Sequence, residues 1–362
     1  MPLRNLQRRS FLSDREGSHR SLVIDKSSSS LILFDKYRAA WLIGITAMLL
    51  AFMMSLQFGS VTLSFKDVLI GLSSFNDSTL DMTSRILIDL RLPRALLAVI
   101  AGAGLAMVGA LLQTSTRNDL ADPFLFGLSS GASAGAVLVI TKVGDALGVW
   151  SLPLAAFSGG IVSATAVLIL FSMQKKKGND NLILCGLAIS FLFGAITSFL
   201  IYSGDQRAAS SILFWTMGGL GLARWDNLIF ALVGVLCLIG LIFKRYRELD
   251  TLLVSEQTTS SLGINVHRLQ SEIFLCCAFC TASIVSMTGV VGFIGLMVPH
   301  LVRPFSGVTH KRALPLVALW GAVLLLFGDV ISRTILAPQE LPVGIVTAAL
   351  GGLFVLYLVW RK

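Results

Sequence analysis

Long apolar runs, each close to the length that crosses a bilayer, recur along this 362-residue chain. The run at 39–58 carries no charged side chain, and similar runs follow at short intervals up to the C-terminus. A helix needs roughly 20 mostly apolar residues to cross the hydrocarbon core of a membrane. With 55 % hydrophobic and 14 % charged residues, the chain does not have the composition of a water-soluble protein. We therefore predict an all-α, polytopic membrane protein.

The apolar pattern predicts ten transmembrane helices. Residues 1–38 are polar and form an expected cytoplasmic tail, and residues 39–362 form a single transmembrane domain. The expected spans are 39–58, 94–113, 123–141, 150–173, 181–202, 225–243, 271–287, 290–302, 313–336 and 343–360. The eighth span is short and contains Pro299, so a broken or partly re-entrant helix is an alternative there.

The distribution of basic residues agrees with this count. If the N-terminus is inside, 21 of the 29 Lys and Arg residues fall on the cytoplasmic side, as the positive-inside rule requires. An even number of crossings also returns the basic C-terminus to the cytoplasm. The net charge of +9 therefore reports orientation, because the basic residues lie between apolar runs and form no stripe of the kind that binds nucleic acid.

The sequence contains no recognisable catalytic or metal-binding pattern. It has no GxxxxGK[ST] phosphate loop and no HExxH motif, and its five cysteines lie within apolar runs, where a thiol packs as a small hydrophobic group. We expect no catalytic residue, no metal and no cofactor. Asp329 and Arg333 are four residues apart within a span, a spacing that predicts an ion pair on one helix face. A structural and a functional role for this pair are equally open.

Three glycines mark a close helix contact. Gly127, Gly131 and Gly135 are spaced by four and therefore share one face of the expected third span. Small residues at this spacing let two membrane helices approach closely. We expect this face to pack against a neighbouring helix.

Two polar segments are not explained by membrane insertion. Arg91 and Arg94 stand at the expected outer start of the second span, where Pro93 suits a first helical turn but cations oppose the helix dipole. Some compensating partner is therefore expected. The longest expected cytoplasmic loop, 244–270, contains predicted short helices at 251–254 and 258–262, the second ended by Gly263. A structured polar loop of this kind is typical of a docking surface for a cytosolic partner.

Four sequence blocks in a fixed order are the most specific signal in the chain. They are RLPRALLAVIAGAGLAMVGALLQTSTRNDLADPFLFGLSSGAS at 91–133, SEQTTSSLGINVHRL at 255–269, VGFIGLMVPHLVR at 291–303 and LPVGIVTAALGGLFVLYLV at 341–359. Together they closely resemble the FecCD-type permease subunits of bacterial ABC importers for iron-siderophores, haem and vitamin B12. Residues 1–38 lie outside the resemblance.

This resemblance implies a ten-helix permease that pairs with a second permease subunit, identical or related. Two cytosolic ABC ATPase subunits dock beneath it, and a periplasmic or lipid-anchored substrate-binding protein delivers the cargo. The family's outward arginines, which meet acidic residues of the binding protein, match Arg91, Arg94 and Arg333. Charge-assisted contacts between arginine and carboxylate are strong and selective. These three residues are therefore the candidates for docking the binding protein.

The resemblance also assigns roles at the cytoplasmic end. The family's coupling helices match 255–269, although Thr259 and Ser260 depart from the commonest pattern. The candidate ATPase contacts are Ser255, Glu256, Ser261, Leu262 and Gly263. In related permeases the fifth and tenth helices line the path, and the loops before the third and fifth helices close its inner end. By position, the candidate inner-gate residues are Asn118, Asp122, Asn179 and Asn181.

The hypothesis from sequence is therefore the passive permease of an ABC importer in a bacterial inner membrane, with an iron-siderophore complex as its cargo. Its expected partners are the second permease, the ATPases, the binding protein and membrane lipid, with no nucleic acid. Haem, vitamin B12 and an oxyanion such as molybdate are alternative cargoes. A carrier driven by an ion gradient would need intramembrane ligands for the coupling ion, and the spans offer chiefly Asp329. A membrane-embedded enzyme would need a cluster of catalytic side chains.

Overall fold

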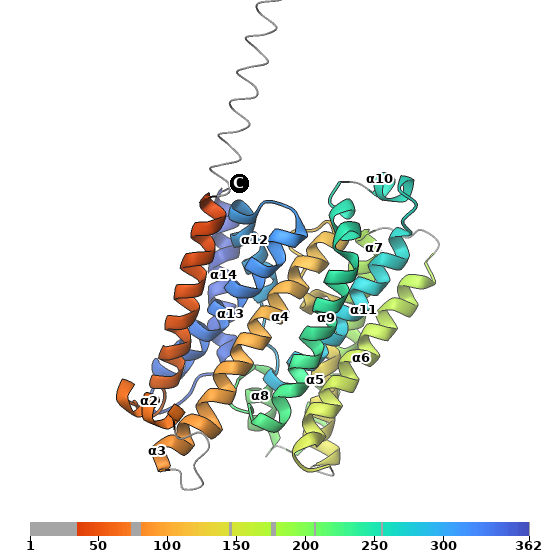
Figure 1. The fold of residues 1–362 in the computed structure, drawn as a ribbon. Helices are drawn as coiled ribbons and strands as arrows, with labels where there is room; N and C mark the ends of the chain where they lie inside the picture. The colour runs from red at the N-terminus through yellow and green to blue at the C-terminus, as the bar shows by residue number, and fades with distance from the viewer. Residues whose placement is uncertain are drawn as a thin grey trace, which may run out of the picture.

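The computed structural model describes residues 35–73, 81–144, 147–174, 179–205, 208–254 and 256–361. All regular elements in these segments are helices, and the long ones run side by side as a bundle (Figure 1). The first helix, Asp35–Gln57, starts at the same end of the bundle at which the last helix ends (Figure 1). The predicted all-α, polytopic fold is confirmed.

After the first helix, long helices alternate with short ones along the chain. In order, they are α2 Phe65–Ser73, α3 Met82–Arg85, η1 Ile86–Arg91, α4 Leu92–Thr116, η2 Pro123–Phe126, α5 Leu128–Leu138, η3 Val139–Val143, η4 Gly148–Trp150, α6 Ser151–Ser172, α7 Asn179–Tyr202, α8 Ala209–Thr216, α9 Trp225–Leu252, α10 Glu256–Ser261, α11 Val266–Thr288, α12 Ile294–Ser306, α13 His310–Thr334 and α14 Val343–Arg361. The short helix α10 lies at one end of the bundle, and α2 and α3 lie at the other (Figure 1).

Eight of the described helical segments are long and apolar enough to cross a membrane. The third expected span is a shorter helical stretch, Leu128–Val143. The eighth, α12, has 13 residues, which at 1.5 Å per residue extend only about 20 Å. Because this is less than the roughly 30 Å of the hydrocarbon core, α12 reaches only part of the way, in agreement with the broken or re-entrant alternative.

Two helices are longer than their apolar runs predict. Helical structure is continuous from Met82 to Thr116, whereas the second span was expected to open at Arg94. Within this stretch η1 is a π-helix, in which the N–H of Leu92 bonds to the carbonyl of Leu87. This widened turn directly precedes Pro93, which has no N–H to donate.

The second long helix is α9, which continues past the expected end of the sixth span at Phe243 and ends at Leu252. Ion pairs stabilise this polar extension, because Arg245 lies 2.7 Å from a carboxylate oxygen of Glu248 and 2.8 Å from one of Glu272. The expected short helix at 251–254 is therefore wrong, since its first residues are the last turn of α9.

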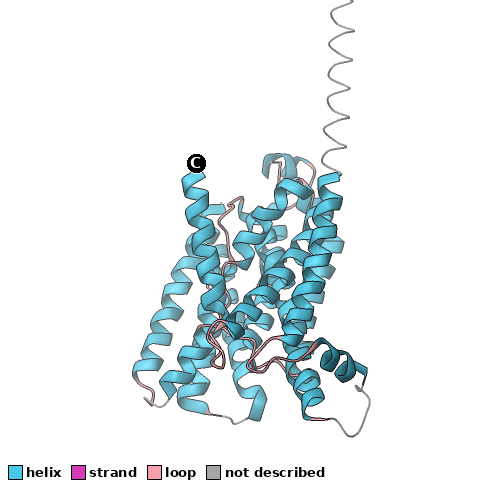
Figure 2. Cartoon of the chain, turned by 90° about the vertical axis from the view of Figure 1, so that its left-hand side faces the viewer, coloured by secondary structure: helices cyan, strands magenta, loops and turns pink. Residues whose placement is uncertain are grey.

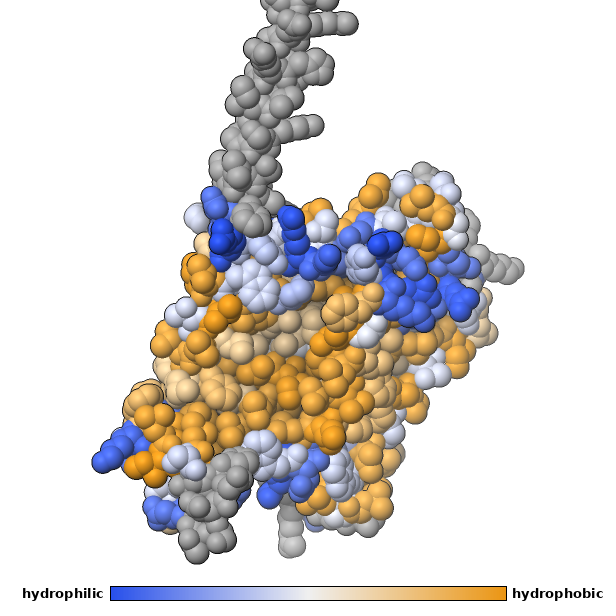
Figure 3. Space-filling view, in the orientation of Figure 1, coloured by the Kyte–Doolittle hydropathy of each residue, from blue (hydrophilic) through white to orange (hydrophobic). Residues whose placement is uncertain are grey.

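The helix α4 is the centre of the bundle and packs against α13, α11, α12 and α9. Its glycines allow this: a Cβ on Gly102 would overlap the carbonyl oxygen of Gly321 in α13, and one on Gly109 would overlap Gly295 in α12. The surface has the opposite character. A band of apolar side chains crosses the visible face between two polar ends (Figure 3), which matches an apolar bilayer core between two aqueous surfaces.

Candidate functional site

Arg91 binds the C-terminal end of the first helix. Its guanidinium NH1 donates to the carbonyl oxygens of Leu56 at 2.7 Å and Gln57 at 2.8 Å, and its NH2 donates to the carbonyl oxygen of Val61. The last carbonyls of a helix lack intrahelical partners and carry partial negative charge. Arg91 satisfies them and is only 5 % exposed.

Arg94 and Arg333 share one buried carboxylate at the same end of the bundle. Asp329, which has no exposed surface, lies 2.9 Å from Nε of Arg94 and 2.8 Å from NH2 of Arg333. Arg333 also donates to the hydroxyl of Ser55 at 2.8 Å, and Arg94 lies 2.7 Å from Oε2 of Glu340. We call Arg94, Asp329, Arg333 and Glu340 the outer charge network. It joins α4, α13, the first helix and the segment before α14.

The outer charge network changes the interpretation of the three arginines. The structure brings them close together, but Arg91 and Arg333 are buried, and Glu340 is the network member with the largest exposed fraction, 40 % of its side chain. The compensating partners expected for Arg91 and Arg94 are present within this chain, whereas the expected start of the helix at Arg94 is wrong. The helical stretch begins at Met82, and carbonyls and carboxylates of this chain already surround both cations. Docking of a binding protein by these arginines stays a prediction.

At the opposite end, α10 is folded against the last turn of α9. The hydroxyl of Thr259, which is fully buried, donates to the carbonyl oxygen of Thr251 at 3.0 Å. Gly263 follows α10 with φ +78°, a left-handed conformation that ends a helix, as predicted. Of the candidate ATPase contacts, Leu262 is 63 % exposed, whereas Ser255 and the side chain of Glu256 lie outside the described residues. Ser261 ends α10.

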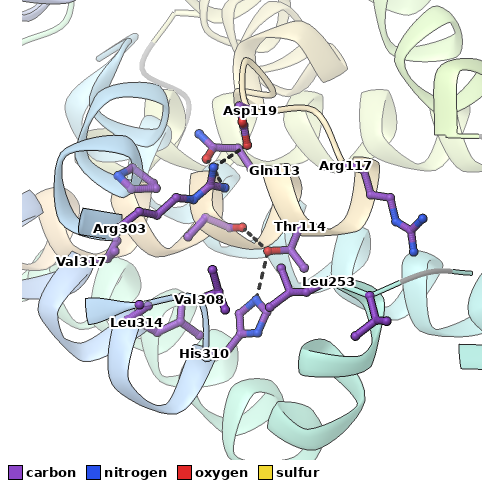
Figure 4. Close-up of a pocket in the computed structure, with 15 residues that line it drawn as sticks. Gln113, Thr114, Arg117, Asp119, Leu253, Arg303, Val308, His310, Leu314 and Val317 are labelled. Carbon is purple, nitrogen blue, oxygen red and sulfur yellow. Dashed lines mark hydrogen bonds and ion pairs between the residues drawn. The ribbon is translucent and has the colours of Figure 1, made fainter. Parts of the chain in front are cut away.

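A cavity of about 330 Å³ lies between α4, α12 and α13, and the residues Leu253 and Val254 that precede α10 also line it (Figure 4). On one side of it, His310 links two helices: its Nδ1 lies 2.7 Å from Oδ1 of Asp250 at the end of α9, and its Nε2 lies 3.0 Å from the hydroxyl of Thr114 in α4. Arg117 strengthens the same junction, since it donates twice to the carbonyl oxygen of Leu252, at 2.9 and 3.1 Å. The segment that leads into α10 is therefore bound to α4 and α13.

On the other side of this cavity, Arg303 connects α12 to the loop after α4 (Figure 4). It forms an ion pair with Asp119 and donates to Oε1 of Gln113 at 3.2 Å. The amide nitrogen of Gln113 in turn donates to the carbonyl oxygens of Gly295 at 3.1 Å and Leu296 at 3.3 Å. Gln113 thereby binds the backbone of the first turn of α12 and holds it against α4.

Two of the candidate inner-gate residues shape the loop between α4 and α5. Oδ1 of Asn118 accepts from the N–H of Leu120 at 2.9 Å, and Oδ1 of Asp122 accepts from the N–H of Phe124 at 2.9 Å, which caps η2. Burial raises the pKa of Asp122 to about 6, because a charged carboxylate loses hydration there. Its second oxygen, Oδ2, is buried without a hydrogen-bond partner.

The other two gate candidates, Asn179 and Asn181, lie in the first turn of α7. The side chain of Asn179 is outside the described residues. The contact between α7 and η2 lies further along the helix, where a Cβ on Gly186 would crowd Phe126. This contact is about two helical turns from Asn179.

The three predicted packing glycines lie where α5 meets α6 and α7. A Cβ on Gly135 would overlap the carbonyl oxygen of Ala155, and one on Gly131 would overlap Ser163. Gly127 adopts φ +78° just before α5, and its carbonyl accepts a hydrogen bond of 2.6 Å from Ser163. Gly131 and Gly135 thus let the backbones of α5 and α6 approach directly.

Residues 47–361 match the sequence profile of the FecCD transport family. The chain belongs to this family. The matched region includes the outer charge network and the α10 end of the bundle. It extends over nearly all described residues, so the family assignment applies to the whole helix bundle. The chain is thus a permease subunit of the ABC importers and is not itself an enzyme. It is a multi-pass membrane protein.

Several relatives share most of their length with this chain. The hemin transport system permease protein of Yersinia pestis is 38 % identical over 85 % of this chain and 91 % of its own length. The iron-uptake system permease protein of Bacillus subtilis is 33 % identical over 76 % and 84 %. The vitamin B12 import system permease protein of Vibrio vulnificus is 32 % identical over 90 % and 95 %.

A solved structure also shares the fold. It is described as an inward-facing conformation of a metal-chelate type ABC transporter, and it covers 91 % of this chain and 99 % of its own with a TM-score of 0.77 at 28 % sequence identity. The agreement over nearly the full length of both chains confirms the fold of this bundle.

Sequence patterns missed most of the polar connections at the α10 end. Among these, the contacts of His310 and Gln113 join residues 60 to 196 positions apart. The only signal was the position of Gln113 and Thr114 at the polar end of an apolar run. Polar side chains there need partners when they are buried, but the identity of the partner is set by the fold.

Proposed function

We propose that this chain is the permease through which an ABC importer passes an iron-siderophore complex across the cytoplasmic membrane of a bacterium. The proposal rests on similarity to named permeases. About one third of the residues are identical, over most of the chain, to permeases named for the uptake of iron, hemin and vitamin B12. Haem is the second candidate, because the hemin permease of Y. pestis is similar over 85 % of the chain. Vitamin B12 and molybdate are further alternatives.

The partners follow from the family. A second permease subunit completes the path, two cytosolic ABC ATPases bind at its cytoplasmic end, and a substrate-binding protein delivers the cargo from outside. In this arrangement the α10 end faces the cytoplasm and the α2 end faces outward, which agrees with the excess of Lys and Arg on the α10 side. The segment 244–270, with α10 at its centre, is the proposed ATPase dock.

Uptake measurements test the proposed cargo. The complete importer in vesicles, supplied with ATP and its binding protein, is expected to accumulate labelled ferric siderophore against a gradient and to leave labelled cobalamin and haem outside. Preference for haem over ferric siderophore by the same complex contradicts the iron-siderophore assignment and favours the second candidate. Uphill accumulation by this chain without the ATPases contradicts the permease proposal as a whole.

Arg94 is the outer arginine best suited to docking, because its partner Glu340 is partly exposed and can be exchanged for a carboxylate of the binding protein. Glu340→Gln removes the competing charge, so we expect the binding protein to bind about two- to fivefold more tightly, while Arg94→Gln weakens binding by a similar factor. Both effects should decrease at high salt. Pull-down of the binding protein across salt concentrations measures them. Wild-type affinity for both variants would remove Arg94 from the dock.

A further inference from the structure

Three segments that each include a helix end and irregular backbone meet within the height of the helix bundle. They are 215–219 at the end of α8, 288–292 from the end of α11 toward α12, and 341–345 at the start of α14, and we call them together the glycine ridge. Figure 2 shows loop segments of this kind lying among the helices instead of beyond their ends. Within the ridge, the N–H of Gly219 donates to the carbonyl of Thr288 at 2.7 Å, and that of Gly344 donates to the carbonyl of Gly218 at 3.4 Å.

Glycine is needed for this contact because backbone meets backbone there. A Cβ on Gly344 would overlap the carbonyl oxygen of Met217, and one on Gly218, which has φ +71°, would overlap the carbonyl oxygen of Val290. Three segments from distant parts of the chain are thus pressed together with no side chain between them. Such a contact has little room to yield, because shifting one segment requires the others to shift with it.

A cavity lies on each side of the glycine ridge. The outer cavity, of about 480 Å³, is lined by Arg94 and Glu340 of the outer charge network together with Trp215 and Gly289. The inner cavity, of about 470 Å³, is lined by Asp122, Phe124, Phe293, Met217 and Ile345, among others. Each of the three segments contributes residues to the lining of both cavities, so the ridge lies between them.

The ridge and both cavities face something other than lipid. Irregular backbone at membrane depth is tolerated only where protein covers it or where it lines an aqueous cavity, because lipid offers no hydrogen bonds. Both cavities also have a lining residue with a buried polar atom that lacks a partner within the described part of the chain: Nε1 of Trp215 at the outer cavity and Oδ2 of Asp122 at the inner one. Apolar walls with a few unpaired polar groups are typical of surfaces that contact organic ligands.

From this arrangement we infer that the glycine ridge is the narrowest part of the cargo path on this chain, and that Met217 and Ile345 limit the size of the chelate that passes. The two cavities are successive positions of a bulky, largely apolar chelate before and after the ridge. The inference rests on the proposed function, since it requires that a chelate is the cargo. It places the size limit at the ridge and not in the loops that carry Asn118 and Asn179.

Substitution of Met217 tests this role, because its side chain lies at the edge of the open inner cavity. Met217→Trp should slow the uptake of a large ferric chelate by about tenfold or more, the factor that a misfit of a few carbon atoms produces in a binding site. Met217→Ala should raise the uptake of chelates larger than the natural cargo. ATP hydrolysis stimulated by the binding protein should stay at the wild-type rate in both variants, which shows that the complex still assembles and couples.

Ile229→Trp is the matched control, since Ile229 is an exposed apolar residue of α9 that lines neither cavity. It should transport as the wild type does. The ridge assignment is overturned if both Met217 variants take up large chelates at the wild-type rate. If Met217→Trp assembles poorly, a wild-type rate of large-chelate uptake by Met217→Ala is sufficient to overturn it. If the wild-type complex itself transports no ferric chelate, the proposed cargo is wrong, and this result is distinct from a failure of the ridge.

Discussion

Asp329→Ala is expected to lower the free energy of unfolding of the permease by about 3–5 kcal/mol, the usual cost of removing one partner from a buried ion pair. Asp329 is fully buried and lies between Arg94 and Arg333. Its removal leaves Arg333 with the Ser55 hydroxyl and backbone carbonyls as partners, whereas Arg94 keeps Glu340. The loss therefore comes mainly from the uncompensated charge of Arg333.

Thermal and denaturant unfolding of the purified chain in detergent measure this loss. Glu340→Ala is the control, because its exposed ion pair is worth no more than about 1 kcal/mol. The double variant Asp329→Ala, Arg333→Met should recover part of the stability, since it removes the isolated charge as well. A stability of Asp329→Ala equal to that of Glu340→Ala would show that the network adds nothing beyond a surface pair. A double variant less stable than Asp329→Ala would exclude Arg333 as the source of the loss.

The outer charge network shows which ion pairs a sequence pattern can predict. Asp329 and Arg333 are one helical turn apart, so their ion pair was predictable from spacing and is confirmed at 2.8 Å. Arg94 meets the same carboxylate from 235 positions away, and no local pattern contains that contact. The charge that a partner protein was expected to supply comes largely from this chain. Local periodicity predicts neighbours on one helix, whereas partners between helices depend on packing.

Helix ends were predicted less well than helix existence, for a related reason. The apolar runs locate the part of each helix that lies in the membrane, but α9 and the stretch from Met82 continue as polar helix beyond it. Pairs such as Arg245 with Glu272 hold that extension, and hydropathy does not report them. Gly263 was predicted correctly because a glycine after a helical pattern has a local meaning, the left-handed conformation that it adopts here.

The glycine ridge was visible in the sequence only as scattered glycines. Gly218, Gly289 and Gly344 each adjoin an apolar run, where a glycine is as readily explained by a turn as by a close contact. Their meaning appears when three segments, far apart in the chain, bring carbonyl oxygens to the places where Cβ atoms would be. The short α12 belongs to the same feature, because it starts at Ile294, two residues after the ridge segment 288–292.

Leu262→Asp is expected to abolish uptake by separating the permease from its ATPases. Leu262 is a large, exposed apolar side chain that directly follows α10, and α10 lies at one end of the bundle (Figure 1). An exposed apolar anchor in a structured loop is the kind of residue that carries interface energy, and its loss typically costs about 2 kcal/mol or more, roughly thirtyfold in affinity. Placing a charge there adds the cost of desolvating it in the interface.

The measurement is co-purification of the ATPase subunits with the membrane-inserted permease, together with uptake in vesicles. Val149→Asp is the matched control, because Val149 is a comparably exposed apolar residue in η4, directly before α6 and outside the proposed ATPase dock at 244–270. The fold tolerates Leu262→Asp, since Thr259 and Gly263 hold α10 in place without it. Full recovery of the ATPases with Leu262→Asp would place their dock elsewhere. The next surface to alter would then be the cavity lined by His310, the residue that contacts Asp250 at the end of α9.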